Sequence, residues 1–129
     1  MLINNMAKTK QKVLIVDDDD SFLFILKKGF SEAGFLVITA KDGADCLSAV
    51  EEEKPALIVS DILLPGLDGI EMAKKLRKKN IETPIVFLSN VTDQEQLDSI
   101  RQIKRCDYLI KSNVQVSDII VKAKDILIK

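Results

Sequence analysis

Polar side chains that could take part in chemistry stand directly after several short apolar segments of this sequence. The first segment is followed by four consecutive aspartates, residues 17–20. Later segments are followed by a carboxylate, a hydroxyl group and an ammonium group, those of Asp61, Ser89 and Lys111. If the segments are parallel strands of one sheet, their carboxyl ends meet at one edge, where ligands of such sheets bind. The spacing therefore predicts a single polar site.

The acidic part of this set predicts a divalent cation. Two carboxylates about 4 Å apart repel each other by roughly 4 kcal/mol at an effective dielectric constant of about 20. A cluster of Asp17, Asp18 and Asp61 therefore requires a positive ion, and a few hard oxygen ligands favour Mg²⁺, with Mn²⁺ as the alternative. Lys111 can meet phosphate oxygens and Ser89 can donate a hydrogen bond to one. Together these groups are typical of a phosphoryl-transfer site.

Each residue of the set also has an ordinary structural interpretation. An aspartate after a strand often caps the next helix, which suits Asp19 or Asp20. Capping suits Asp17 and Asp18 less well, because one helix needs only one cap. Taken separately, Asp61 could be a turn residue, Ser89 a helix cap and Lys111 a surface charge. All these interpretations together would require four coincidences at one edge of the sheet.

Five short apolar segments, rich in β-branched residues, predict the strands that carry the site. They do not alternate with polar residues, which is typical of strands covered on both faces in a parallel sheet. The segments are Val13–Val16, Leu36–Ile38, Leu57–Val59, Ile85–Leu88 and Tyr108–Ile110. Helical patterns lie between and after them. This alternation predicts a flavodoxin-like α/β three-layer sandwich with five helices and a five-stranded parallel sheet in the order 2-1-3-4-5.

The helices are predicted from apolar residues at helical spacing. The first begins at Asp19 or Asp20 and ends before Gly34. The others cover Ala44–Val50, Ile70–Leu76, Asp93–Ile103 and Val116–Leu127. On the first helix Phe24 is expected to face away from the core. The residues of that helix expected to face inward are Phe22, Leu23, Ile25, Leu26 and Phe30.

The composition limits the possible classes of function. A length of 129 residues fits one domain, and we expect it over residues 12–129, after a disordered extension at residues 1–11. A net charge of −1 gives no basic excess for direct binding of nucleic acid. No apolar run is long enough to cross a membrane.

Two further residue types narrow the chemistry. The chain has no histidine, which excludes a Ser-His-Asp triad, a histidine zinc site and an internal phosphohistidine. Cys46 and Cys106 follow no metal-ligand spacing, so we expect reduced thiols in a cytoplasmic protein.

Four motifs together resemble those of response-regulator receiver domains. They are the aspartates after the first strand, a D-x-x-L-P-x-x-D-G motif that begins at Asp61, the hydroxyl residue Ser89, and a Y-L-x-K motif that ends at Lys111. The combination is highly specific, and the resemblance runs from about Lys12 to the C-terminus. It implies a signalling domain of two-component systems that promotes its own phosphorylation and dephosphorylation but is not otherwise an enzyme.

The resemblance implies a role for each residue near the carboxylates. Asp61 would accept a phosphoryl group from a phosphohistidine on a sensor histidine kinase or a histidine phosphotransfer protein. Asp18 and Asp61 would bind Mg²⁺ directly, together with the backbone carbonyl of Leu63, while Asp17 would bind it through water. Lys111 would hold the phosphoryl group.

The resemblance also implies a switch. Ser89 would turn toward the phosphoryl group and the ring of Tyr108 would follow inward, which would change binding to an unknown output protein. Such a domain is expected to be a monomer or a weak dimer. Two alternatives within the family are a phosphorelay shuttle without an output of its own and a pseudo-receiver that is never phosphorylated.

Two positions depart from the family pattern. Asn90 stands where the family prefers Ala or Gly, beside the path of the phosphoryl group. Ser112 replaces the usual proline after the lysine. A cis bond between Lys111 and Ser112 would cost about 3 kcal/mol, so we expect either a trans bond with an adjusted loop or a strained cis bond. Either would shift Lys111.

Two other classes of function fit the sequence less well. A haloacid-dehalogenase-type phosphatase needs Gly-Thr after its D-x-D motif, whereas Ser21 and Phe22 follow Asp20 here. A flavodoxin-like cofactor carrier needs a phosphate-binding loop after the first strand, where four aspartates would repel the phosphate of FMN.

Overall fold

The sheet has the predicted strand order. The computed structural model describes residues 10–90 and 93–128. The strands are β1 (Lys12–Val16), β2 (Leu36–Ala40), β3 (Leu57–Ser60), β4 (Ile85–Ser89) and β5 (Cys106–Ile110). All neighbouring strands pair in parallel, in the order β2-β1-β3-β4-β5. This order places β1 beside β3, so that the chain reverses its direction of winding between these two strands.

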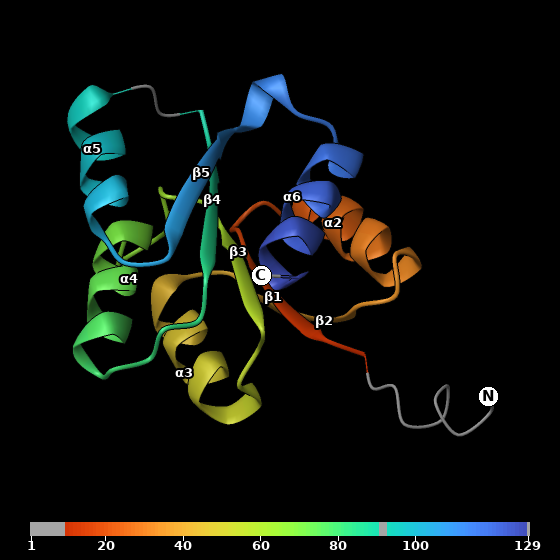
Figure 1. Cartoon of the computed structure of the whole chain (residues 1–129), viewed down its shortest axis with the longest axis horizontal. Coiled ribbons are helices and arrows are strands. Elements are labelled where there is room, and N and C mark those ends of the chain that lie inside the picture. The colour runs from red at the N-terminus through yellow and green to blue at the C-terminus, as the bar shows by residue number, and fades with distance from the viewer. Residues whose placement is uncertain (1–9, 91–92, 129) are drawn as a thin grey trace.

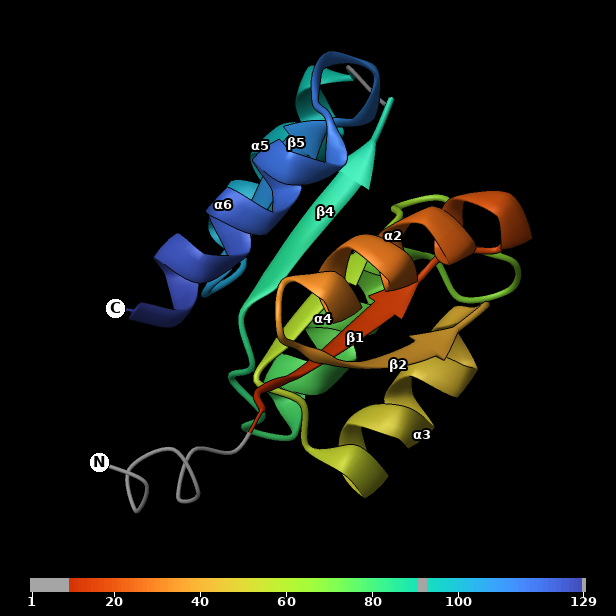
Figure 2. The ribbon, with the colours of Figure 1, turned by 90° about the vertical axis from the view of Figure 1, so that its right-hand side faces the viewer.

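Five α-helices alternate with the strands in the described part of the chain, and they cover both faces of the sheet (Figure 1). They are α2 (Asp20–Glu32), α3 (Gly43–Glu53), α4 (Gly69–Lys78), α5 (Gln94–Gln102) and α6 (Val116–Ile128). A short 3-10 helix, η1 (Lys111–Asn113), follows β5. Helices α3, α4 and α5 lie on one face, and α2 and α6 lie on the other (Figures 1 and 2). The predicted three-layer α/β sandwich is confirmed.

Each face of the sheet has its own hydrophobic core. Successive side chains of a strand point to opposite faces. Leu14 and Val16 of β1 therefore pack in the core beneath α3, α4 and α5. Val13 and Ile15 pack in the core beneath α2 and α6. The unbroken apolar pattern of β1 thus reflects a strand buried between two layers of helices, which fixes the position of the aspartates that follow it.

Aspartates begin four of the helices, which accounts for many acidic residues of the sequence. Asp19 caps α2, because its side chain accepts hydrogen bonds from the backbone N–H groups of Ser21 and Phe22. Asp42, Asp68 and Asp93 cap α3, α4 and α5 in the same way. A cap satisfies N–H groups that have no partner within the helix. Asp17 and Asp18 cap no helix and are left for another role.

Two predictions about burial were wrong. Ile25 was expected to face the core, but it is 50% exposed, because α2 buries a narrow stripe made of Leu23, Leu26 and Phe30. The second strand was expected to be covered on both faces. It is an edge strand, and Leu36 at its start is 47% exposed.

The loop after β3 is held close to Asp61 by a glycine. The backbone N–H of Gly69 donates a hydrogen bond of 2.8 Å to the carbonyl of Ile62. A Cβ atom at position 69 would lie 2.6 Å from the carbonyl oxygen of Asp61 and 2.8 Å from the ring of Phe87. Such distances are too short for non-bonded contacts, so this approach of helix α4 to the end of β3 requires glycine.

The predicted N-terminal extension lies almost wholly outside the described residues, which begin at Lys10. Within the described ranges, no helix combines the length and the apolar character needed to cross a membrane.

Candidate functional site

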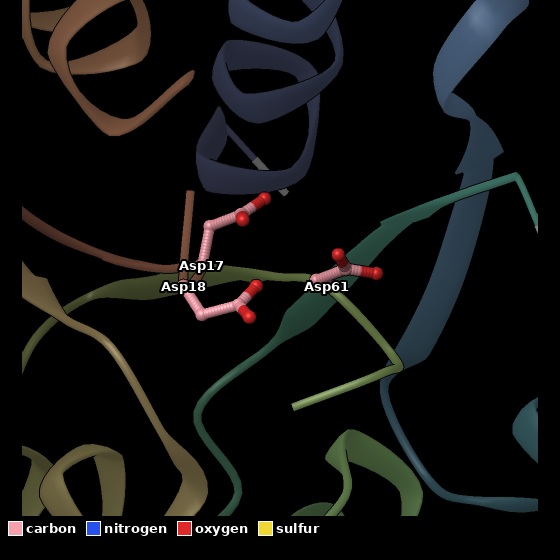
Figure 3. A group of neighbouring side chains, drawn as sticks. All are labelled: Asp17, Asp18 and Asp61. Atoms are coloured by element: carbon pink, nitrogen blue, oxygen red, sulfur yellow. The ribbon is translucent and has the colours of Figure 1, made fainter. Parts of the chain in front are cut away.

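Adjacent strands bring three carboxylates together at the carboxyl edge of the sheet. Val16 at the end of β1 pairs with Ser60 at the end of β3. The next residues, Asp17 and Asp61, therefore leave the sheet side by side, and the N–H of Asp61 still donates to the carbonyl of Val16 at 2.9 Å. Oxygen atoms of Asp17, Asp18 and Asp61 lie within 4.8 Å of one another (Figure 3). The predicted acidic cluster is present.

Lys111, which directly follows the edge strand β5, brings a positive charge to this cluster. Its Nζ atom donates to Oδ2 of Asp17 at 2.9 Å and lies 3.7 Å from Oδ2 of Asp61. The Asp17 residue is only 2% exposed, so this ion pair is well shielded from water. The ammonium group also lies 4.1 Å from the centre of the Phe22 ring, a favourable cation–π contact.

Asp61 is partly buried and is held by the backbone that follows it. Its Oδ1 atom accepts hydrogen bonds from the N–H groups of Ile62, at 2.7 Å, and Leu63, at 3.4 Å. Burial raises the pKa of Asp61, Lys111 lowers it, the charge of Asp17 raises it, and the two N–H groups lower it; the net direction is upward. The folded protein therefore binds a proton on the Asp61 carboxyl group more tightly than the unfolded chain does.

The contribution of this carboxyl group to the stability of the fold falls as the pH rises from the ordinary carboxyl range through the raised pKa.

Ser89 and Lys111 share a pocket with Asp61. The pocket has a volume of about 290 Å³ and is lined by Asp61, Leu63, Ser89, Asn90 and Lys111. Ser89 is buried at the end of β4. A carboxylate, a hydroxyl group and an ammonium group therefore face one small space, as the sequence predicts.

The second residue of the predicted switch, Tyr108, is not among the residues that line this pocket. It lies on β5 opposite Phe87 of β4 and is partly exposed. Its hydroxyl oxygen accepts a hydrogen bond of 2.7 Å from Arg101 on α5, and the guanidinium carbon lies 5.5 Å from the ring centre. The tyrosine is therefore partly exposed beside α5, with its hydroxyl group engaged by Arg101.

The carboxylates fit a hard divalent cation. The three side chains offer charged oxygen ligands and lie close enough to share one ion, and Mg²⁺ prefers a few carboxylate oxygens with water completing its shell. Asp17 is buried whereas Asp18 is exposed, so the cluster is open to solvent on one side. The backbone carbonyl of Leu63 remains a predicted ligand, because the contacts described above involve the N–H of that residue.

The repulsion within this cluster leads to a prediction about stability. An ion that binds only the folded state stabilises it by mass action. Millimolar Mg²⁺ is therefore expected to raise the melting temperature, and Asp18→Ala is expected to remove most of the increase. Thermal unfolding in EDTA and in Mg²⁺ measures the effect. Asp20→Ala is the control, because Asp20 pairs with Lys41 outside the cluster and should leave the increase intact. Identical curves for the wild type in EDTA and in Mg²⁺ would contradict the prediction.

The two departures from the family pattern contact each other. The bond between Lys111 and Ser112 is trans, which decides between the two alternatives. The backbone N–H of Ser112 donates a hydrogen bond of 2.9 Å to Oδ1 of Asn90. A proline at position 112 would have no N–H to donate. Val91, two positions after Ser89, lies outside the described residues.

Sequence reasoning missed two contacts at the site. Phe22 was assigned to the core, whereas its ring lies against the ammonium group of Lys111. Arg101 was not singled out, although it holds Tyr108. Both contacts join residues that are far apart in the sequence or on different elements, and neither follows a local motif.

The two cysteines take no part in this chemistry. Both are free thiols. Cys46 is buried, and its burial, helped by the charge of Asp42, raises its pKa to about 12. A thiol with so high a pKa is a poor nucleophile.

Comparison with known proteins identifies a family. Residues 13–124 match the family described as "Response regulator receiver domain". The alkaline phosphatase synthesis transcriptional regulatory protein PhoP of Bacillus subtilis is 40% identical over 103 residues, which are 78% of this chain and 42% of that protein. The transcriptional regulatory protein PrrA of Mycobacterium tuberculosis is 34% identical over 119 residues, 92% of this chain and 51% of PrrA. The chain thus spans about half the length of these relatives.

Solved structures show the same fold. A two-component response regulator from Clostridium difficile has a TM-score of 0.85 and 27% identity, with 93% of this chain and 98% of that chain covered. The chemotaxis response regulator CheY4 of Vibrio cholerae has a TM-score of 0.83 and 27% identity, with 92% and 99% covered. Family match, relatives, fold and the carboxylate cluster agree, and the chain belongs to the receiver domains of two-component response regulators.

Proposed function

We propose that this receiver domain accepts a phosphoryl group on Asp61 and uses it to change binding to a partner protein. The observation that carries the proposal is the placement of Asp61. It is a partly buried carboxylate within reach of Asp17, Asp18 and the ammonium group of Lys111. Among the described residues that line its pocket, Asp61 is the one that carries a carboxylate.

The proposed reaction is a transfer from nitrogen to oxygen. An oxygen of Asp61 attacks the phosphorus of a phosphohistidine on the donor protein. The O–P bond forms as the N–P bond breaks, and the imidazole leaves with the electron pair and takes up a proton. Mg²⁺ bound by Asp17, Asp18 and Asp61 would supply positive charge to the phosphoryl oxygens. Lys111 already lies between Asp17 and Asp61, so a short movement of its ammonium group would bring it to the product.

The proposed response starts at Ser89 and ends at Tyr108. A phosphoryl group on Asp61 carries about two negative charges on three acceptor oxygens, in place of the single charge of the carboxylate, which favours a turn of the Ser89 hydroxyl toward it. Space then opens for the Tyr108 ring, which must break its hydrogen bond with Arg101 to move inward. The surface formed by α5 and β5 would differ between the two states.

The donor and the output are proposed from the family. A receiver domain implies a sensor histidine kinase or a histidine phosphotransfer protein as donor. The similar proteins PhoP and PrrA are transcriptional regulators, so an output that affects transcription is consistent with the family. The net charge of −1 does not favour direct contact of this domain with nucleic acid. A role as a phosphorelay shuttle remains the alternative.

The proposed function is tested with a small phosphodonor. Incubation with acetyl phosphate and Mg²⁺ is expected to add one phosphoryl group to the protein, seen by intact-protein mass spectrometry. EDTA in place of Mg²⁺ is expected to prevent the addition. Absence of any added mass in Mg²⁺ would support the phosphorylation-independent alternative.

The exposed face of α2 predicts where the donor protein docks. Phe24 is 69% exposed, as predicted, and Ile25 beside it is half exposed. Buried aromatic residues dominate the energy of many interfaces. Phe24→Ala is therefore expected to slow transfer from the cognate phosphodonor protein about tenfold or more, and to leave labelling by acetyl phosphate unchanged. Rates with the two donors provide the measurement. Val121→Ala on α6, also exposed, is the control. Equal loss with both donors would mean that Phe24 supports the fold instead.

The residues around the pocket predict a long-lived phosphoryl group. In receiver domains, the side chains two positions after the phosphoacceptor and two positions after the hydroxyl residue flank the path of the attacking water. Here they are Leu63, which is 62% exposed and lines the pocket, and Val91. Neither side chain can orient or activate water. Self-dephosphorylation is therefore expected to take many minutes rather than seconds, and Leu63→Asn combined with Val91→Glu should accelerate it. The measurement is phosphate loss in Mg²⁺ after removal of the donor. A half-life of seconds for the phosphorylated wild type would contradict the prediction.

A further inference from the structure

Asn90 joins the end of β4 to the turn that carries Lys111. Its Oδ1 atom accepts a hydrogen bond of 2.9 Å from the backbone N–H of Ser112, 22 residues further along the chain. Ser112 lies in η1, which begins with Lys111. Asn90 also lines the pocket that contains Asp61 and Ser89. Its side chain therefore stands between two elements at the mouth of the site.

The hydrogen bond from Ser112 fixes which end of the amide is available. A carboxamide has one oxygen that accepts and one nitrogen that donates two hydrogen bonds. The oxygen of Asn90 is already engaged by Ser112. The Nδ2 atom of Asn90 takes no part in that hydrogen bond. The group that remains for a ligand in the pocket is thus a donor, and its orientation is set in advance.

The chemistry of the pocket calls for such a donor. A phosphoryl group on Asp61 would bring three strong acceptor oxygens. Lys111 and Ser89 can each supply a donor, and Lys111 must also neutralise the buried Asp17, with which it pairs at 2.9 Å. A neutral N–H donor can contact an oxygen of the phosphoryl group without adding a further charge to the site.

We infer that the side-chain amide of Asn90 is an additional phosphoryl-binding group of this site, held in its orientation by the backbone N–H of Ser112. This inference rests on the proposed phosphorylation of Asp61 and deepens it. The other interpretation of Asn90 is steric: a side chain larger than alanine that covers the pocket and hinders entry. The two interpretations predict opposite effects when the side chain is shortened, because a donor stabilises the bound group whereas a cover obstructs it.

The test uses beryllium trifluoride, a phosphoryl mimic that binds to a carboxylate oxygen, with the whole chain in Mg²⁺. Asn90→Ala is expected to weaken its binding about fivefold, the effect of one lost neutral hydrogen bond. Asn90→Asp keeps an oxygen for Ser112 but puts a carboxylate where the donor was, and is expected to weaken binding more than Asn90→Ala. Ser112→Ala, which keeps the backbone N–H, should bind as the wild type does.

Equal or tighter binding by Asn90→Ala would overturn the inference and favour the steric interpretation. Weaker binding by Ser112→Ala than by Asn90→Ala would also overturn it, because the Ser112 side chain would then be the group that matters. Failure of the proposed function looks different: the wild type would not bind the mimic, or Asp61→Asn would bind it as well as the wild type does.

A spectroscopic measurement separates direct contact from a change in packing. In ¹⁵N-labelled protein, the side-chain amide resonances of Asn90 are assigned by their absence in Asn90→Asp. Saturation with the mimic is expected to shift these resonances and to slow exchange of one amide proton with water. Resonances that neither shift nor gain protection when the mimic is bound would overturn the inference.

Discussion

Asp61→Asn is expected to abolish labelling by acetyl phosphate completely. The amide oxygen is a much weaker nucleophile than a carboxylate. The substitution also removes one of the three charged ligands of the cluster and leaves Asp17 and Asp18. The exchange is nearly isosteric, and it removes a charge whose burial raises the pKa of the carboxyl group. The variant is therefore expected to fold and, without Mg²⁺, to melt at a higher temperature than the wild type.

Asp68→Asn is the matched control for this variant. Asp68 lies on the same loop and caps α4 through a hydrogen bond to the N–H of Glu71, a role that asparagine also fills. It lies outside the acidic cluster, so labelling should be unchanged. Labelling of Asp61→Asn at the rate of the wild type would place the phosphoryl group on another residue.

Lys111→Met is expected to slow labelling by about tenfold to a hundredfold, the effect of a lost hydrogen bond to a charged group. The lysine is the cation nearest to Asp61 among the ion pairs of the described residues, at 3.7 Å. Its loss also leaves the buried carboxylate of Asp17 without its partner. The melting temperature in EDTA should therefore fall, because an unpaired buried charge is costly. Initial rates of labelling and thermal unfolding are the two measurements.

Lys122→Met is the control for the loss of a lysine. Lys122 forms an ion pair with Asp107 on the surface of α6 and β5, where such pairs contribute little to stability. It should label and melt nearly as the wild type does. A labelling rate in Lys111→Met equal to that of Lys122→Met would show that the ammonium group near Asp61 does not assist transfer.

Most of the fold could be predicted because its signals are local. The apolar run Val13–Val16 needs cover on both faces, and the structure buries it between two cores. Parallel strands send their carboxyl ends to one edge, and strand order alone therefore predicts that Asp17, Asp61 and Lys111 lie together. These predictions depend on strand order and direction, and not on the details of side-chain packing.

The errors and omissions came from contacts between elements. Periodicity alone could not show that α2 buries only a narrow stripe, so Ile25 was placed in the core. The hydrogen bond between Asn90 and Ser112 depends on a trans bond after Lys111 and on the path of η1. The contact of Arg101 with Tyr108 likewise depends on how closely α5 packs on β5. Such contacts are fixed by tertiary structure and carry no sequence signal of their own.

The most direct test of the account identifies the residue that carries the phosphoryl group. Borohydride reduces an aspartyl phosphate to homoserine, a change that survives digestion and is located by peptide mass spectrometry. After labelling with acetyl phosphate and Mg²⁺, homoserine is expected at position 61, and unmodified aspartate at positions 17 and 18. Homoserine at any other aspartate, or no homoserine in a protein that has gained a phosphoryl group, would contradict it.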